Sequence, residues 1–423
     1  MYTTLSNFIK DFVIHRRVSM FLDDINTAEY NTELSVNIKD KKVLVIGGAG
    51  SIGSSFIRAL LQFEPKSLVV VDTNENALAE LSRDLRSTPG MYIPEEYIPY
   101  PMDFSSEVFR TMFIDRCKRY GNFDIVANFS AHKHVRSEKD IYSIEALLTN
   151  NIIHARKLLD LLKIYPPEHF FCVSTDKAAN PVNIMGASKR IMEDLIFTYS
   201  EYFPVTTARF ANVAFSNGSL PEGFLRRIDK LQPISAPSDI KRFFVSPEES
   251  GQICMLACIL GQNREIFFPK LEEEQMETFD KIAVDLLHEK GFEIDRCSSD
   301  SEAIKKSVAL QNGKPMLKDG KVLYPVYFSK SDTVGEKSFE EFFTATENVD
   351  MNRFKSLGVV TGKSKPNEEK LIRFLDDLEK LFENNRTGEK EGKLGKDEIV
   401  RLMAEYLPNF HHIETGKNLD SKM

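Results

Sequence analysis

The sequence of 423 residues has few cysteines, no excess of positive charge and no long apolar run. Its five cysteines include no pair with the C-x-x-C spacing of redox and zinc sites, so we expect reduced, buried thiols and a cytoplasmic protein. A net charge of −8 argues against nucleic acid as a partner. No apolar run reaches the ~20 residues of a membrane span, and charged residues interrupt the first 20 positions, so no secretory signal is expected. The eight histidines form no zinc ligand set, and no metal is predicted.

From residue 41 onward, short apolar runs alternate with helical patterns. The runs lie at 43–46, 68–71, 123–129, 169–173 and 205–210, and the helical patterns include 141–163 and 184–200. Strands that alternate with helices predict an α/β fold, a doubly wound and mostly parallel sheet of the Rossmann type with helices on both faces.

We expect four segments along the chain. Residues 1–40 form a helical arm, 41–215 a dinucleotide-binding domain, 216–365 a smaller substrate lobe, and 366–423 a polar tail with helices near 367–383 and 396–406. The lobe is expected where the strand–helix repetition weakens and Pro, Gly and Ser become frequent. The tail is expected because charged residues dominate its composition.

A glycine-rich turn follows the first apolar run and opens a helix. Glycines allow a tight turn and a close approach to a pyrophosphate, and a helix N-terminus offers unpaired N–H groups. Asp72 ends the next strand about 20 residues on, where a ribose-binding acid belongs, and a carboxylate there favours NAD over NADP. Asp103 follows the next strand and either contacts adenine or caps its own loop. The predicted cofactor-binding residues in this part of the chain are Gly47, Gly50, Ser51, Ile52, Gly53, Asp72 and Asp103.

The segment 173–190 places ionisable side chains at the end of a buried strand. It reads Val-Ser-Thr-Asp-Lys, then Ala-Ala-Asn-Pro, and continues into Met-Gly-Ala-Ser-Lys-Arg. Ligands of doubly wound sheets bind beyond the carboxyl ends of the strands. The segment therefore predicts the catalytic site.

This segment resembles the extended short-chain dehydrogenase/reductases, and more narrowly their nucleotide-sugar 4,6-dehydratases. It is most similar to the branch that acts on UDP-N-acetylglucosamine, whose motif reads S-T-D-K-A followed by N-P-x-N-x-M-G-x-S-K-R. The resemblance covers about residues 41–345, and includes Ser130–Val135, Thr149-Asn150, Arg209–Val213, Arg242–Phe244 and Gly335–Lys337.

The resemblance implies a reaction and a role for each residue. The sugar is oxidised at C4 with NAD, water leaves across C5 and C6, and the hydride returns to C6. Asp176 is implied as the acid for the C6 hydroxyl, Lys177 as the base at C5, and Thr175 as the partner of the C4 oxygen. Lys189 is implied to hold the nicotinamide ribose. Two lysines near Asp176 would depress its pKa, which suits a base better than an acid.

Met185 stands where the wider family has the active-site tyrosine. A thioether transfers no proton, but the named branch carries Met here, so Met185 supports the assignment and implies retention of configuration at C5. The group that deprotonates the C4 hydroxyl stays open. So do a GDP-linked substrate, a C4-epimerase or 4-ketosugar reductase, and a non-catalytic NAD-binding protein.

A nucleotide-sugar diphosphate requires donors and positive charge, which Arg supplies in a planar fork. Arg242 is the first candidate by its match to the family, and the other predicted substrate-binding residues are Lys133, Asn212, Ser219 and Glu336. The family also implies a homo-oligomer, paired through the helices that flank the Lys189 helix.

Overall fold

The computed structural model describes residues 4–134, 138–331, 340–387 and 394–413, and its centre is a sheet of nine strands in the order β15-β16-β10-β6-β5-β4-β1-β2-β3. All neighbours from β3 to β10 are parallel, whereas β16 and β15 extend the opposite edge in antiparallel fashion. The strands are β1 (Lys42–Ile46), β2 (Ser67–Asp72), β3 (Glu96–Pro101), β4 (Ile125–Asn128), β5 (His169–Val173), β6 (Val205–Ala208), β10 (Glu265–Pro269), β15 (Asn348–Asp350) and β16 (Leu357–Thr361).

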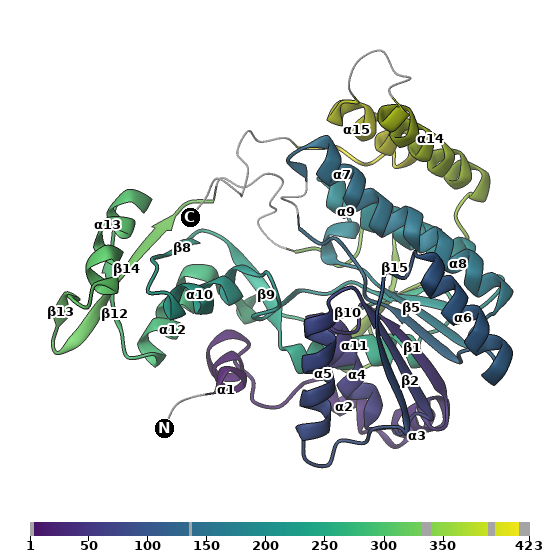
Figure 1. The fold of residues 1–423 in the computed structure, drawn as a ribbon, viewed down its shortest axis with the longest axis horizontal. Helices are drawn as coiled ribbons and strands as arrows, with labels where there is room; N and C mark the ends of the chain where they lie inside the picture. Colours follow the sequence, from purple (N-terminus) through teal and green to yellow (C-terminus); the bar gives the residue numbers. More distant parts are fainter. Residues whose placement is uncertain (1–3, 135–137, 332–339, 388–393, 414–423) are drawn as a thin grey trace.

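Helices cover both faces of this sheet (Figure 1). In β1, Leu44 and Ile46 enter one core cluster, and Val43 and Val45 enter the other. A strand buried on both faces needs apolar residues at every position, which explains the unbroken run 43–46. The α/β, doubly wound fold is confirmed.

The two faces are covered by helices from different parts of the chain. One face carries α6 (Glu107–Tyr120), α7 (Ile141–Leu148), α8 (His154–Ile164) and α9 (Ile184–Thr198), with a π-helical turn (Thr149–Ile153) joining α7 to α8. The other carries α3 (Ala28–Ile38), α4 (Ser51–Leu61), α5 (Glu75–Ser87) and α11 (Pro247–Ile259).

The smaller lobe lies to the left of the sheet in Figure 1 and has its own apolar core. It contains one sheet ordered β11-β9-β7 and another ordered β12-β14-β13, with β8 paired to β14. Its elements are β7 (Asn212–Val213), α10 (Leu220–Asp229), β8 (Ile234–Pro237), β9 (Lys241–Val245), β11 (Met276–Thr278), α12 (Phe279–Glu289), β12 (Glu293–Arg296), α13 (Asp300–Gln311), β13 (Leu317–Lys318) and β14 (Lys321–Ser329).

The predicted boundaries at 215 and 365 do not coincide with these two bodies. Helix α11 and strands β10, β15 and β16 all fall within the expected lobe, 216–365, yet they belong to the main sheet and its covering layer. The physical reason is burial. Strands β6 and β16 flank β10, and its residues Ile266, Phe267 and Phe268 are only 0–2% exposed. The chain therefore crosses between the bodies several times.

The N-terminal segment joins the two bodies. It comprises α1 (Leu5–Phe8), a π-helical turn (Ile9–Val13), α2 (Leu22–Ile25) and α3. Phe8 and Val13 enter the core of the lobe, whereas Phe21 and Leu34 enter the core of the main sheet. Between them, Arg16 donates to both carboxylate oxygens of the buried Glu249, at 2.6 and 2.8 Å.

The C-terminal helices α14 (Glu368–Thr387) and α15 (Lys396–Tyr406) lie where helices were predicted, above α7 and α8 in Figure 1. Polar residues dominate their composition, but α14 buries one apolar stripe in the same core cluster as α7, α8 and α9. Arg386 pairs with Glu145 of α7, and Tyr406 donates to Asp194 of α9. Hence this part of the tail is a packed layer of the domain.

This layer bears on the expected homo-oligomer. Pairing through the helices that flank Lys189 would use the outer faces of α7, α8 and α9, and α14 and α15 of the same chain cover part of these faces. An oligomer would need a surface beyond this covered area. No helix among the described residues is both long enough and apolar enough to cross a membrane.

The packing of α14 predicts a large loss of stability for Phe374→Ala. Phe374 is 3% exposed, and truncation of a buried Phe costs about 3–5 kcal/mol through lost transfer free energy and a residual cavity. Ile372, two residues away, is 40% exposed, so Ile372→Ala should change stability by about 0.5 kcal/mol or less. Denaturant unfolding of both variants measures the difference, and equal effects would contradict the packing described here.

Candidate active site

The glycine turn after β1 has no room for side chains. Gly47 has φ +71°, a Cβ on Gly48 would lie 2.4 Å from Cγ1 of Val70, and a Cβ on Gly53 would lie 2.4 Å from the carbonyl oxygen of Gly47. Gly50 precedes the first residue of α4 as its N-cap. The backbone is thereby free to meet a phosphate at the helix N-terminus. The turn also lies at the switch point of the sheet, because β1 pairs with β2 on one side and β4 on the other.

Asp72 lies beside this turn. Its carboxylate accepts hydrogen bonds from the backbone N–H of Ala49 at 3.1 Å and of Asn74 at 2.9 Å, so it joins the end of β2 to the glycine turn. Asp103 accepts from the backbone N–H of Ser105 at 2.7 Å, which is the loop-capping arrangement of the two alternatives. Ser51 accepts from the backbone N–H of Asn217 at 2.9 Å, and this contact brings the first loop of the lobe to the turn.

Thr175, Asp176 and Lys177 are brought together directly after β5. The Thr175 hydroxyl donates to Oδ1 of Asp176 at 2.7 Å, and Nζ of Lys177 donates to the two carboxylate oxygens at 3.2 and 3.3 Å. The Asp176 side chain is 8% exposed, and that of Lys177 is 38% exposed. A 3-10 turn (Asp176–Ala178) therefore presents a buried acid beside an accessible amine.

Helix α9 brings Lys189 to the same place. Asn183 caps this helix by accepting from the N–H of Gly186 at 2.8 Å. A Cβ on Gly186 would lie 2.7 Å from the carbonyl oxygen of Lys177, so the helix starts in contact with the 3-10 turn. Lys189 donates to the carbonyl oxygen of Val173 at 3.1 Å, and burial lowers the pKa of its ammonium group. Met185 is 3% exposed on this helix.

A buried network of ion pairs holds helix α9 in place. Arg209, which is fully buried, donates to Glu193 of α9 at 2.6 and 2.8 Å and to Glu347 at 2.9 and 3.1 Å. Glu193 also accepts from the Ser174 hydroxyl at 2.6 Å. Despite burial, Arg209 holds the pKa of Glu193 below its ordinary value and helps to lower that of Glu347 to about 2.

Glu340 is a site residue that the sequence reasoning missed. Its carboxylate accepts from the Phe243 N–H at 2.8 Å and from the Asn212 side chain. Burial, and after it the charge of the nearby Asp176 carboxylate, raise the pKa of Glu340 to about 8 against the opposing effects of the Phe243 N–H, Lys177 and Arg242. The only signal in the sequence was that Glu340 lies three residues beyond the matched Gly335–Lys337 segment. Glu336, the predicted residue there, is outside the described residues.

The predicted substrate-binding residues lie in different surroundings. Arg242, in β9, is 7% exposed and near Glu340, and Asn212 is held against Glu340. Ser219 caps α10 by accepting from the N–H of Glu222 at 3.3 Å. Lys133, after β4, is close enough to Glu222 for the two charges to interact. Thus β7 and β9 lie near the end of β5 through Glu340, and the start of α10 lies near the loop after β4.

A second residue outside the predictions orders the loop after β4. Asn151 accepts from the N–H of His132 at 2.9 Å, donates to its carbonyl oxygen at 3.0 Å, and donates to the Ser188 hydroxyl at 3.1 Å. It follows the matched pair Thr149-Asn150 immediately, in the π-helical turn. Asn151 therefore connects the Lys133 loop to α9.

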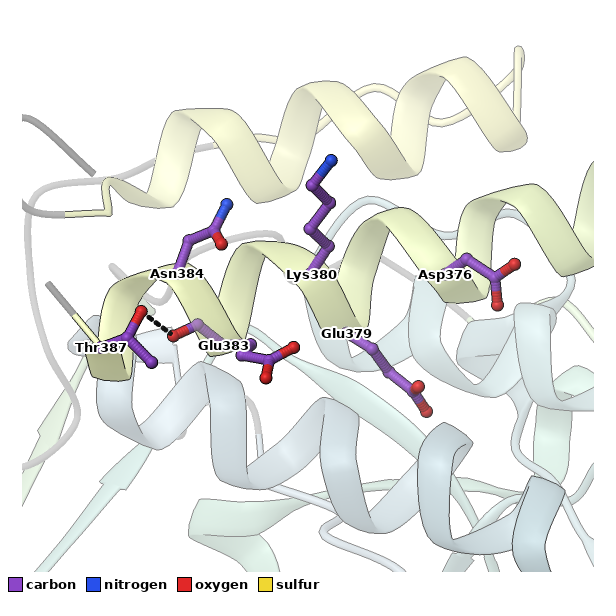
Figure 2. A pocket seen from close by; sticks show the side chains of 6 residues that line it. All are labelled: Asp376, Glu379, Lys380, Glu383, Asn384 and Thr387. Atoms are coloured by element: carbon purple, nitrogen blue, oxygen red, sulfur yellow. Dashed lines mark hydrogen bonds between the residues drawn. The ribbon is translucent and has the colours of Figure 1, made fainter. Parts of the chain in front are cut away.

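One hollow of the molecule is unrelated to this chemistry. It has a volume of about 490 Å³, and the described residues that line it are Asp376, Glu379, Lys380, Glu383, Asn384 and Thr387 of α14 (Figure 2). The Thr387 hydroxyl in it bonds back to the carbonyl oxygen of Glu383. None of the predicted site residues that the structure describes lines it.

The doubly wound fold, the glycine turn at its switch point and the buried helix lysine define an extended short-chain dehydrogenase/reductase. Within that class, the chain belongs to the family described as polysaccharide biosynthesis protein, whose profile matches residues 43–361. The resemblance found in the sequence is thereby confirmed.

Known relatives are similar to a large part of the chain. An uncharacterized membrane protein of Methanocaldococcus jannaschii is 33% identical over 60% of this chain and 74% of its own. The probable polysaccharide biosynthesis protein EpsC of Bacillus subtilis is 30% identical over 62% of this chain, but only 42% of its own length is covered. The structure of Pen from Bacillus thuringiensis has a TM-score of 0.57 at 20% identity, over 78% of this chain and 90% of that one, which shows the shared fold.

Relatives with named reactions fall into two kinds. A UDP-glucose 4-epimerase of Rickettsia bellii is 29% identical over 60% of this chain and 72% of its own. A UDP-N-acetylglucosamine 4,6-dehydratase (inverting) of Campylobacter jejuni is 27% identical over 55% of this chain and 67% of its own.

The ion network predicts that Arg209→Met destabilises the protein near neutral pH and that this difference from the wild type shrinks in acid. Removing one partner of a buried pair leaves an uncompensated charge and costs about 3–5 kcal/mol, whereas Arg83→Met, at an exposed site, should be nearly neutral. Because the folded pKa of Glu347 is lowered from 4.5 to about 2, its stabilisation is present above pH 4.5 and disappears as the pH falls toward 2. Unfolding measured from pH 7 to 3 should show the variant converging on the wild type at low pH. A gap that is independent of pH would contradict the assignment.

Glu340 should affect the pH dependence of stability in the opposite direction to Glu347, and Glu340→Gln tests this. Between pH 4.5 and about 8, folded Glu340 retains a proton that the unfolded chain releases, so its presence lowers stability as the pH rises through this window. The variant should lose this slope, which melting temperatures at pH 5–9 would reveal. Glu379→Gln, on the exposed face of α14, provides the control, and an unchanged slope in Glu340→Gln would show that the carboxyl titrates normally.

Proposed function

We propose that this protein is an NAD-dependent 4,6-dehydratase that converts UDP-N-acetylglucosamine to the 4-keto-6-deoxy sugar nucleotide. The observation that carries the proposal is the hydrogen-bonded group Thr175–Asp176–Lys177 beside the buried Lys189. Family membership supports a nucleotide sugar as the substrate, and the relative from Campylobacter jejuni supports this sugar and reaction.

The residues around the glycine turn fit NAD. There is no space for a Cβ at Gly48 or Gly53. The N-terminus of α4 offers N–H groups to a pyrophosphate. Asp72 lies beside the turn and accepts from the N–H of Ala49. When bound, NAD supplies a hydride acceptor that later returns the hydride. Lys189, with its lowered pKa, is placed to hold the nicotinamide ribose at the end of β5. Asp103 near the adenine edge remains a prediction.

The acid and the base of the elimination are neighbours in the chain. Lys177, the more accessible of the two, is assigned the removal of the C5 proton, and Asp176 the protonation of the leaving C6 hydroxyl. Thr175 hydrogen-bonds the C4 oxygen. An elimination requires one group that takes a proton and one that gives it, and this pair supplies both within one turn.

Glu340 supplies a protonated carboxyl group near Asp176. Burial and the nearby carboxylate of Asp176 both disfavour the ionised form of Glu340. With a pKa of about 8, Glu340 keeps a proton in the acid pair near neutral pH. We assign Glu340 the role of holding that proton, with Arg242 beside it as the diphosphate-binding cation.

A C4-epimerase is the second candidate, because the relative from Rickettsia bellii carries that name. Epimerisation requires oxidation and reduction at C4 but no acid and base for water loss. The hydrogen-bonded Asp176–Lys177 pair therefore favours the dehydratase. The paired groups also weigh against a non-catalytic NAD-binding protein, for which Met185 is the best support.

The decisive experiment is mass spectrometry of UDP-N-acetylglucosamine, and separately of the GDP-linked sugar, after incubation with the protein and no added reductant. Loss of one water without net NADH supports the dehydratase and identifies the nucleotide. A product of unchanged mass that separates from the substrate by chromatography before mass detection supports the epimerase. No conversion of either sugar refutes the proposed substrates.

Asp176→Asn and Lys177→Ala should each lower the rate of water loss by about 10²–10⁴-fold, the usual range for a lost acid or base. Asp377→Asn, on the exposed face of α14, should leave the rate unchanged. Bound NAD should persist in all three variants, since none of these residues lies at the glycine turn. Full activity of both site variants would rule out the assigned roles.

A further inference from the structure

The chain that follows α15 returns to the start of the catalytic helix. Phe410 is 3% exposed in the core cluster that also holds residues of α9. The N–H of Ile413 donates to the carbonyl oxygen of Val182 at 3.0 Å, one residue before the N-cap of α9. This segment is far from α9 in sequence and adjacent to it in space.

His412 makes the most enclosed contact of this segment. Its Nε2 lies 3.1 Å from Oε2 of Glu138, and the two side chains are 7% and 6% exposed. Lys396, at the start of α15, is 3.9 Å from the same carboxylate oxygen. The tail therefore contributes two groups that face Glu138.

Glu138 connects His412 to α9. Its other oxygen, Oε1, accepts from the backbone N–H of Met185 at 3.1 Å. The first N–H groups of a helix have no partner within the helix, and a carboxylate there is favoured by the helix dipole. Asn183 accepts from the N–H of Gly186, and Glu138 accepts from the N–H of Met185. The two side chains therefore bind consecutive amides of the first turn.

The first turn of α9 determines where Lys189 lies. Gly186 touches the carbonyl of Lys177 so closely that a side chain would not fit, and Lys189 follows one turn later on the same helix. A small shift of this turn would move Lys189 relative to Asp176 and Lys177. Misplacement of a catalytic group by about 1 Å can cost about 100-fold in rate.

We infer that His412 is a positioning residue, which fixes the catalytic helix through Glu138 and the backbone amide of Met185. The C-terminal segment is thus part of the active site's support. The rate measured below rests on the proposed dehydratase function, but the placement of the helix does not.

The test compares His412→Ala, His412→Gln and His411→Ala in the full chain with NAD bound. His411 is the exposed neighbour of His412 and serves as the matched control. His412→Ala should speed hydrogen exchange about tenfold in the peptide that holds Met185 and Gly186, without a comparable change in the strands of the main sheet. Glutamine can donate to Glu138 and should restore most of the protection.

Turnover supplies the second readout. His412→Ala should lower kcat for water loss about tenfold with KM within twofold of the wild type, and His412→Gln should recover most of it. In the double variant with Glu138→Ala, the loss should not exceed that of the larger single variant, because both residues act through one contact.

Either of two results would overturn the inference: exchange and turnover of His412→Ala that match His411→Ala, or faster exchange spread evenly over the whole chain. If the wild type removes no water from any sugar nucleotide, the proposed function fails, and the exchange experiment still decides the role of His412.

Discussion

The guanidinium of Arg209 is the buried charge around which the site is organised. A fully buried cation is costly unless it is paired, and its planar fork meets two carboxylates that come from distant parts of the chain. Glu193 belongs to α9, which also carries Lys189, and Glu347 lies just before β15. Glu193 additionally accepts from Ser174. One cation therefore links the end of β5, helix α9 and the edge of the sheet at β15.

The proposed catalytic group lies where residues from the side of the lobe approach the end of β5. Glu340 and Arg242 approach it from that side, and the low dielectric of the enclosed space makes a second charge beside Asp176 unfavourable. The chemistry therefore depends on the contact between the two bodies as much as on the motif that the strand presents.

Segments near both ends of the chain tie distant parts of the structure together. The N-terminal segment contributes to both apolar cores and pairs Arg16 with Glu249 between them. The C-terminal helices extend the layer over α7 and α8, and the residues after them reach the start of α9. These ties restrict how the lobe and α9 can move relative to the main sheet.

The sequence by itself determined the fold class, the strand runs from 43 to 210, the glycine turn and the cluster 174–189, because these are local patterns of apolar period, glycine spacing and neighbouring polar residues. It did not reveal that β10, β15 and β16 return to the main sheet, since a short apolar run does not state which strand it will pair with. Nor did it reveal Glu340, Glu193, Asn151 or Glu138. Each is an ordinary polar residue in the sequence and acquires a role only from partners tens to hundreds of positions away. Burial and long-range pairing, which only the tertiary structure decides, turn these side chains into the supports of the site.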